Sequence, residues 1–276
     1  MQSDLEALGV SSRRGRNTQR RVHRARAHAL DDVDQLYAET EEDYGLPTGR
    51  LLWSIVGGLV LLYPCIAMAQ LCGSWIGSQE LLGNMRESQL NFCFLVGVVL
   101  SFALLAVPLT RTLLLPLYVI GHEVTHAIFV FVCYGKVSDF RASAGGGYII
   151  ANRANILVSL SPYVVPFWTL VLALGHALLA IVVDLTVALP YLTALYGATW
   201  FFNLFWTVWM IPLGQTDLSA NGTFFSLTLI FLANITVLSL LLEFMRPTPS
   251  VEAWFYAVMN AHNGLWYQLT SLLGGG

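Results

Sequence analysis

Six apolar runs, each long enough to cross a lipid bilayer, constrain this chain more than any other feature. A transmembrane helix needs about 20 predominantly apolar residues. Only 11% of the 276 residues are charged, whereas soluble domains carry about 25%. The pattern predicts an all-α, polytopic membrane protein with about six transmembrane helices. The predicted spans are 51–72, 90–110, 113–135, 154–183, 188–211 and 223–245.

The fourth of these runs, 154–183, is longer than a single upright helix requires. It contains Pro162 and Pro166. Proline lacks a backbone N–H and clashes with the preceding helical turn. We therefore expect a kink or a break within this span.

Polar segments flank the apolar runs and predict three parts. Residues 1–49 hold a basic block (13–28) followed by an acidic block (31–45), which is typical of a flexible, solvated arm. Residues 50–245 form the transmembrane core. Residues 246–276 carry aromatic and aliphatic side chains at roughly helical spacing, which predicts an amphipathic helix in the membrane interface. The basic residues beside the first span predict a cytoplasmic N-terminus.

Two histidines and a glutamate interrupt the third apolar run, in the segment VIGHEVTHAIFVF (119–131). On a helix, His122 and His126 project from one face and could bind one tetrahedral zinc ion, leaving room for a water and a further ligand. Glu123 can act as the general base toward a zinc-bound water. A charged carboxylate at the centre of a membrane helix costs roughly 2.5–3.5 kcal/mol. The motif therefore indicates a metal site more strongly than a chance match.

The segment after this motif, 136–153, contains residue types that favour β-strands, such as Val137, Phe140 and Ile149. Its glycines at 145–147 suit a turn or a close backbone approach. These features predict a small β-hairpin after the HExxH helix, and its open edge could bind an unwound substrate as an added strand. A plain connecting loop is the alternative interpretation.

Three stretches together resemble the site-2 protease family of intramembrane zinc metalloproteases, in particular its compact bacterial members. They are HEVTH within an apolar helix, the Gly-rich GKVSDFRASAGGGYIIANR leading to SLSPYVVP, and GQTDLSANG between late apolar runs. The resemblance covers about 110–225. It implies that His122, His126 and Asp217 hold Zn²⁺ and that Glu123 activates the water. It also implies a bacterial cell membrane as the location and a membrane protein or peptide as the substrate.

The chain departs from the family pattern at two places. The Asp-Gly pair that is usual in the family is absent, because Asp217 is followed by a leucine. The sequence SPYVV stands where the family often has an asparagine. The donor that would stabilise the oxyanion of the reaction is therefore left among Tyr163, Asn155 and Asn203.

Other polar residues in or near the apolar runs compete for a place in the site. Asp184 lies near the end of a long run, and we expect it to be an interface residue. His176 is expected to be a core histidine with a hydrogen-bond partner, and His262 to be solvated in the tail. Asn203 should bond across helices or to the site. Gln215 has a position that suits a supporting role beside Asp217.

We therefore expect an intramembrane zinc endopeptidase that hydrolyses a peptide bond in a membrane-embedded substrate through a Glu-activated, zinc-bound water. The alternatives are a zinc-binding but proteolytically inactive membrane regulator, a membrane transporter, and a non-proteolytic hydrolase that uses the same water. A transporter should show ionisable residues on several helices, whereas here they cluster at one motif and one loop. We expect a lipid bilayer around the protein and no nucleic-acid partner, and the oligomeric state stays open.

Overall fold

The structure is a computed structural model that describes residues 47–77, 85–143, 146–213, 215–246 and 249–274. The predicted polar arm, 1–49, lies almost entirely outside the described residues. Apart from the first three residues of the first helix, the helices and strands described here belong to a unit that begins at Arg50.

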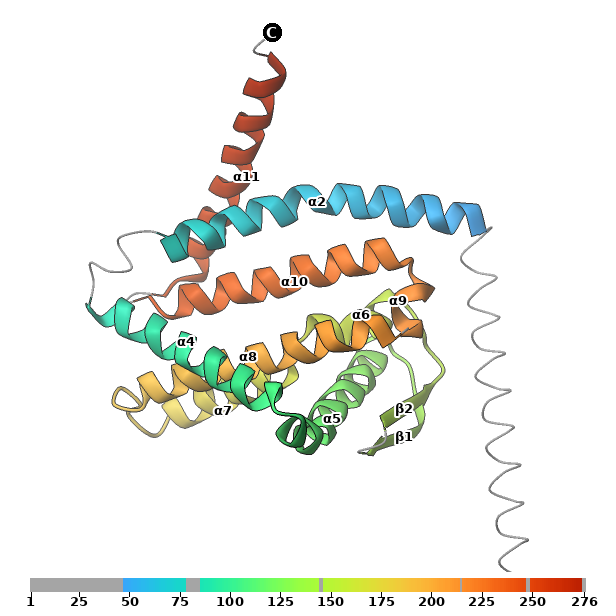
Figure 1. Cartoon of the computed structure of the whole chain (residues 1–276), viewed down its shortest axis with the longest axis horizontal. Helices are drawn as coiled ribbons and strands as arrows, with labels where there is room; N and C mark the ends of the chain where they lie inside the picture. The colour runs from blue at the N-terminus through green and yellow to red at the C-terminus, as the bar shows by residue number, and fades with distance from the viewer. Residues whose placement is uncertain (1–46, 78–84, 144–145, 214, 247–248, 275–276) are drawn as a thin grey trace, which may run out of the picture. The chain divides into compact units, whose positions relative to one another are not determined.

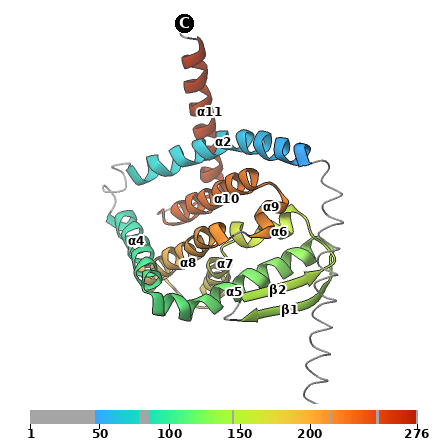
Figure 2. The same cartoon turned by 45° about the vertical axis from the view of Figure 1, so that its right-hand side comes forward.

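Long apolar helices make up most of this unit. Figures 1 and 2 show α10 running between α2 on one side and the pair α6 and α8 on the other. Apolar clusters join these layers, for example Met68 and Leu71 of α2 against Ile235 of α10. The helices are α2 (Pro47–Gly77), α4 (Met85–Ala106), α5 (Pro108–Val132), α6 (Ile156–Val164), α7 (Phe167–Ala180), α8 (Leu189–Met210), α9 (Thr216–Ala220), α10 (Thr223–Phe244) and α11 (Val251–Gly274), with a 3₁₀ turn η1 (Ile211–Leu213).

The structure supports an integral membrane protein but does not confirm six spans. Among the described residues, four helices are long and apolar enough to cross a membrane, or five if the bent pair α6–α7 is one span. The predicted span 188–211 corresponds to α8, which does not meet this criterion because threonine, asparagine and aromatic side chains interrupt its apolar character. The four helices contain the stretches Leu51–Trp75, Gln89–Ala106, Pro108–Val132 and Thr223–Phe244.

The predicted break in the fourth apolar run is confirmed. Helices α6 and α7 are separated by a short break and differ in direction by 72°. Val165 has an extended backbone, with φ −97° and ψ 111°, as the residue before a proline prefers. Pro166 then precedes the first turn of α7, where a missing N–H costs no helical hydrogen bond. The run therefore forms two short helices at an angle.

The predicted β-hairpin is also confirmed, and it lies beside α5 (Figure 2). Strand β1 (Val137–Ser143) pairs antiparallel with β2 (Gly146–Ala151). The register sets Arg141 opposite Tyr148, and β1 carries one extra residue between Val137 and Asp139. Tyr134, with φ 59°, turns the chain out of α5 toward the hairpin. The chain therefore folds back along the helix that carries the HExxH motif.

Helices α4 and α8 approach each other at two glycines. A Cβ atom on Gly97 would lie 1.8 Å from the carbonyl oxygen of Ala194, and one on Gly197 would lie 2.1 Å from the carbonyl oxygen of Phe94. Small residues allow the backbones of membrane helices to pack closely. These glycines therefore set the distance between α4 and α8.

We expect Gly97→Ala to lower the apparent melting temperature of the detergent-solubilised protein. The added methyl meets backbone atoms that cannot rotate away, and such overpacking costs about 1–3 kcal/mol. Gly73→Ala, on α2, is the matched control because nothing lies within 4 Å of its Cβ position. It should leave stability unchanged or raise it by about 0.4–1 kcal/mol. Equal melting temperatures for the two variants would contradict the α4–α8 contact.

Candidate metal centre

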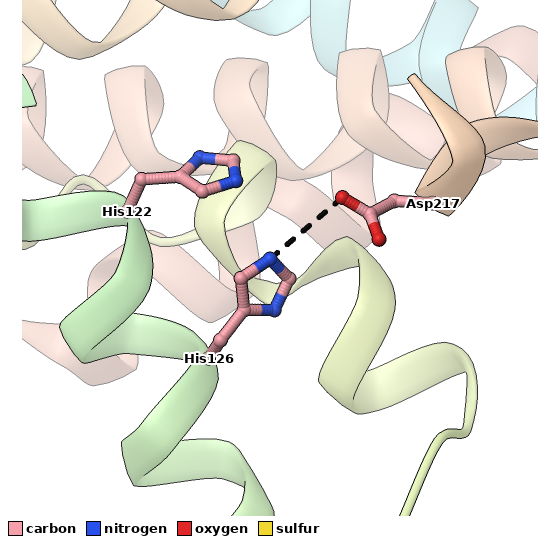
Figure 3. A group of neighbouring side chains, drawn as sticks. All are labelled: His122, His126 and Asp217. Atoms are coloured by element: carbon pink, nitrogen blue, oxygen red, sulfur yellow. Dashed lines mark ion pairs between the residues drawn. The ribbon is translucent and has the colours of Figure 1, made fainter. Parts of the chain in front are cut away.

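The two histidines of the HExxH motif lie on one side of α5 and face the same space. Their ring centroids are 4.9 Å apart, and their planes are nearly perpendicular. His126 is buried and His122 is half-buried. Figure 3 shows both rings turned toward the carboxylate of Asp217. The helical spacing thus places the pair as the sequence predicts.

Asp217 reaches this space from α9, a five-residue helix between α8 and α10. Its Oδ2 atom lies 3.7 Å from Nε2 of His126. Ligand atoms of His122, His126 and Asp217 all lie within 4.8 Å of one another. The structure therefore brings together the three predicted ligands, and this group could hold a metal ion.

His126 forms its hydrogen bond through Nδ1, which leaves Nε2 available as a metal ligand. Its Nδ1 atom lies 2.8 Å from the carbonyl oxygen of Val158. A carbonyl can only accept, so Nδ1 carries a proton, and in the neutral imidazole Nε2 is then the unprotonated nitrogen on the side of Asp217. The 3.7 Å separation between Nε2 and the Asp217 oxygen is too long for a hydrogen bond. It is close to the roughly 3.4 Å between two ligand atoms at zinc-ligand distances in a tetrahedral site.

His122 has an outer partner of its own. The hydroxyl of Tyr118 lies 3.1 Å from Nδ1 of His122. Tyr118 is buried and stacks on Trp206 of α8, with ring centroids 5.3 Å apart. If Nδ1 donates to this hydroxyl, Nε2 is available as a ligand. Both histidines therefore have the kind of supporting contact that orients metal ligands.

The short helix α9 is held against α6 by polar contacts. Asn221, at its C-terminal end, donates to Oγ of Ser159 at 2.7 Å and to the carbonyl of Asp217 at 3.3 Å. Gly222 has φ +84°, and a Cβ there would lie 2.5 Å from Cβ of Ser54 on α2. Only glycine fits this combination of backbone angle and contact. These contacts place the Asp217 carboxylate opposite α5.

Glu123 lies on a neighbouring face of α5 and is covered by the hairpin. It is buried, with 6% of its surface exposed. A Cβ on Gly147 would lie 2.5 Å from Cγ and 2.6 Å from Oε1 of Glu123. Strand β2 therefore rests directly on the glutamate, and a glycine is required at that position. The predicted general base therefore lies on the helix that carries the two histidines and is covered by strand β2.

The competing residues lie elsewhere and have partners of their own. Asp184 is exposed and accepts hydrogen bonds from the N–H and hydroxyl of Thr186, which lower the pKa of its carboxyl group. His176 bonds the hydroxyl of Tyr196, so it has the expected hydrogen-bond partner, but it is half-buried and does not lie in the core. The expectation for His262 was wrong, because it is half-buried against Tyr63, with ring centroids 5.7 Å apart.

Asn203 also differs from the prediction. Its side chain is buried on α8, but its Nδ2 atom has no hydrogen-bond partner among the described residues. Asn155 caps α6 by accepting from the N–H of Val158 at 2.9 Å. Of the three candidates for an oxyanion donor, Tyr163 has the contact with the site: its hydroxyl lies 3.2 Å from Oδ2 of Asp217.

Sequence reasoning missed three supporting residues: Tyr118, Gly147 and Asn221. Tyr118 precedes His122 by one helical turn, so helical periodicity could have placed it beside the histidine. No local signal identifies Gly147 as the contact of Glu123, or Asn221 as the anchor of α9. Both contacts depend on how distant segments pack.

The fold and the site together define a class: a mainly helical protein whose apolar helices could span a membrane and which carries a candidate metal centre on one of them. No protein-family model, curated protein or solved structure matches the chain. Any narrower assignment therefore depends on the chemistry of the site.

Proposed function

We propose that this protein is an intramembrane zinc endopeptidase of the site-2-protease type. The observation that carries the proposal is the convergence of His122, His126 and Asp217 beside a buried glutamate, with both histidines and the glutamate on a helix apolar enough to span a membrane. Two imidazoles and one carboxylate are a usual ligand set for catalytic zinc, which keeps a further position open. Ionisable residues inside membrane helices generally serve function. We also propose a cytoplasmic N-terminus and a bacterial cell membrane.

The chain's own residues supply the remaining chemistry. A zinc ion bound by the three ligands would make a water molecule nucleophilic at neutral pH. Glu123 accepts a proton from the attacking water and later donates it to the nitrogen of the leaving peptide. Val158 and Tyr118 hold the two imidazoles in orientation through their outer nitrogens. Burial of Glu123 under β2 limits its access to bulk water.

A transmembrane substrate must unwind locally before it can be cleaved. In a helix the carbonyl of each peptide bond is already hydrogen-bonded within the segment. The freed backbone groups then need new partners, and a strand edge can provide them. The described sheet has two strands, so β2 keeps an outer edge beside Glu123. We propose that the unwound substrate pairs with this edge.

The register identifies which amides of β2 face that edge. Backbone N–H groups alternate in direction along a strand. The N–H of Asn152 donates to the carbonyl of Lys136 on the β1 side, 3.2 Å away. The N–H groups of Tyr148 and Ile150 therefore point toward β1, and that of Ile149 points outward.

Proline at position 149 should lower cleavage without unfolding the hairpin. Ile149→Pro removes an outward N–H, and proline is tolerated on the free side of an edge strand. Loss of one backbone hydrogen bond to substrate, worth about 0.5–1.5 kcal/mol, predicts a roughly 2- to 13-fold drop in kcat/KM. Zinc content and melting temperature should stay at wild-type values.

Two controls accompany this variant. Ile149→Ala keeps the amide while removing most of the side chain, and it separates backbone pairing from side-chain contact. Tyr148→Pro and Ile150→Pro remove N–H groups that face β1, so they should lower the melting temperature. Equal tolerance of proline at all three positions would make the segment a plain connector and move the search for the substrate strand elsewhere.

The function itself is tested with purified protein in liposomes that contain single-span model peptides. We expect about one zinc per chain by elemental analysis and cleavage within the apolar part of a peptide. His122→Ala should lose both zinc and cleavage. A wild-type protein that binds zinc and cleaves none of the peptides would contradict the proposal and favour an inactive zinc-binding regulator. Normal zinc content in His122→Ala would contradict the metal centre.

A further inference from the structure

The side chain of Tyr163 lies against two of the three candidate metal ligands. Its side chain is fully buried. Its hydroxyl donates to Oδ2 of Asp217 at 3.2 Å and lies 3.5 Å from Oε1 of Gln215. Its ring meets His122 edge to face, with centroids 5.2 Å apart. The phenol therefore touches the carboxylate ligand and one of the histidine ligands.

The surroundings of Tyr163 hold the ring in place. Leu160, Leu218 and Ile230 pack with it in one apolar cluster. Asn234 of α10 donates to the backbone carbonyl of Tyr163 at 2.8 Å. Because ring and backbone are both anchored, the hydroxyl is positioned before any ligand binds. Preorganised donors of this kind are the ones that stabilise developing charge most effectively.

Peptide hydrolysis needs such a donor near the metal. As water attacks, negative charge develops on the carbonyl oxygen of the scissile bond, and one donor to that oxygen is worth about 10²–10³-fold in rate. The hydroxyl of Tyr163 contacts a metal ligand from the α6 side, whereas Glu123 lies under β2 on a neighbouring face of α5. Glu123 and the hydroxyl of Tyr163 therefore belong to different helices, α5 and α6, that both border the candidate metal centre.

We propose that Tyr163 is a catalytic residue whose hydroxyl donates a hydrogen bond to the carbonyl oxygen of the scissile peptide bond as that oxygen becomes negatively charged. This inference rests on the proposed endopeptidase function and names the oxyanion donor that the sequence leaves open.

The step balances without a further reactant. The water oxygen bonds to the carbonyl carbon, the electron pair of the C=O π bond moves to the carbonyl oxygen, and Glu123 takes the proton of the water. Tyr163 turns its single O–H from Oδ2 of Asp217 to the oxyanion and keeps its own proton. When the C=O bond re-forms, the C–N bond breaks, and the proton on Glu123 passes to the departing nitrogen.

The test compares two isosteric variants of the full-length protein, Tyr163→Phe and Tyr118→Phe. Each removes one hydroxyl beside the metal ligands and keeps the ring packing. Zinc affinity is measured by chelator competition. The constants kcat and KM are measured at saturating zinc, and folding is followed by the melting temperature. Two binding measurements are added. The first is binding of a phosphinic peptide, whose tetrahedral phosphorus group resembles the reacting carbonyl, to the zinc-loaded protein. The second is binding of the corresponding uncleaved peptide to the zinc-free protein, which cannot hydrolyse it.

For Tyr163→Phe we expect zinc affinity lower by no more than about 10–100-fold, because the hydroxyl also donates to the ligand Asp217. Melting temperature and KM should stay near wild type, and kcat at saturating zinc should be lower by about 10²–10³-fold. Affinity for the phosphinic peptide should fall by a comparable factor, and binding of the uncleaved peptide should hardly change. For Tyr118→Phe, which removes the outer partner of His122, we expect zinc affinity lower by about 10–100-fold, and its loss of kcat at saturating zinc should be smaller than that of Tyr163→Phe. The two hydroxyls would then have separate roles.

Wild-type kcat in Tyr163→Phe would overturn the proposal while leaving the endopeptidase function intact. Weakened zinc binding with kcat restored by added zinc would also overturn it, because Tyr163 would then only position Asp217. A wild-type protein that binds zinc but neither cleaves peptides nor binds the phosphinic peptide would overturn both proposals.

Discussion

Glu123→Gln should abolish most cleavage while the protein keeps its zinc. Glutamine has nearly the same shape, so it fits the space under Gly147, where the backbone of β2 leaves no room for a larger group. It cannot accept the proton of the attacking water, and loss of a general base costs about 10²–10⁴-fold in rate. Zinc content should not change, because Glu123 is outside the three-ligand group. The measurement is cleavage of a model transmembrane peptide beside elemental analysis.

Glu243→Gln is the matched control for that variant. Glu243 is the other buried glutamate among the described residues, with 2% of its surface exposed. It lies at the end of α10, where it accepts from the N–H of Ser250 at 3.3 Å and pairs with Arg246 at 3.5 Å. Its neutralisation should leave the cleavage rate unchanged. Near-wild-type cleavage by Glu123→Gln would remove the protease hypothesis.

Asp217→Ala should lose zinc. Catalytic zinc sites usually have three protein ligands, and this change leaves two histidines on one helix. The loss of affinity should exceed the roughly 10–100-fold effect of removing an outer partner. Zinc should therefore raise the melting temperature of the wild-type protein and hardly affect that of the variant. A ligand at 1,000 times its Kd stabilises a folded state by about 4.1 kcal/mol, which is readily measured.

Asp184→Ala serves as the control for this second prediction. Asp184 is exposed in the segment between α7 and α8, where its carboxylate bonds Thr186. Its removal should leave both zinc affinity and the zinc-dependent melting shift intact. The reverse result, with zinc lost only in Asp184→Ala, would move the third ligand and discredit the placement of Asp217.

Several features follow from the sequence because they depend on residues that are close together in the chain. The spacing of His122 and His126 places both rings on one side of α5, since a helix repeats every 3.6 residues. Strand-favouring residues around a glycine turn predicted the hairpin. Pro166 predicted the break between α6 and α7, whereas Pro162 lies inside α6. Each is a local preference of the backbone.

The number of membrane spans was harder to predict from the sequence. An apolar run indicates that a helix can lie in lipid, but α8 carries polar and aromatic side chains that make its status ambiguous from hydropathy. Its close contact with α4 through Gly97 and Gly197 shows that another helix covers part of its surface. Burial against other helices cannot be read from one segment alone.

The sequence by itself determined the paired histidines, the adjacent glutamate, the hairpin and the broken fourth run, because short-range geometry decides them. The family resemblance named Asp217 as a ligand, but the tertiary structure decided that it meets the histidines. Only the tertiary structure decided that Gly147 covers Glu123 and that Tyr163 contacts Asp217. These contacts join α5 to segments far along the chain. They depend on how several helices pack at once, and the spacing of residues within one helix carries no information about that packing.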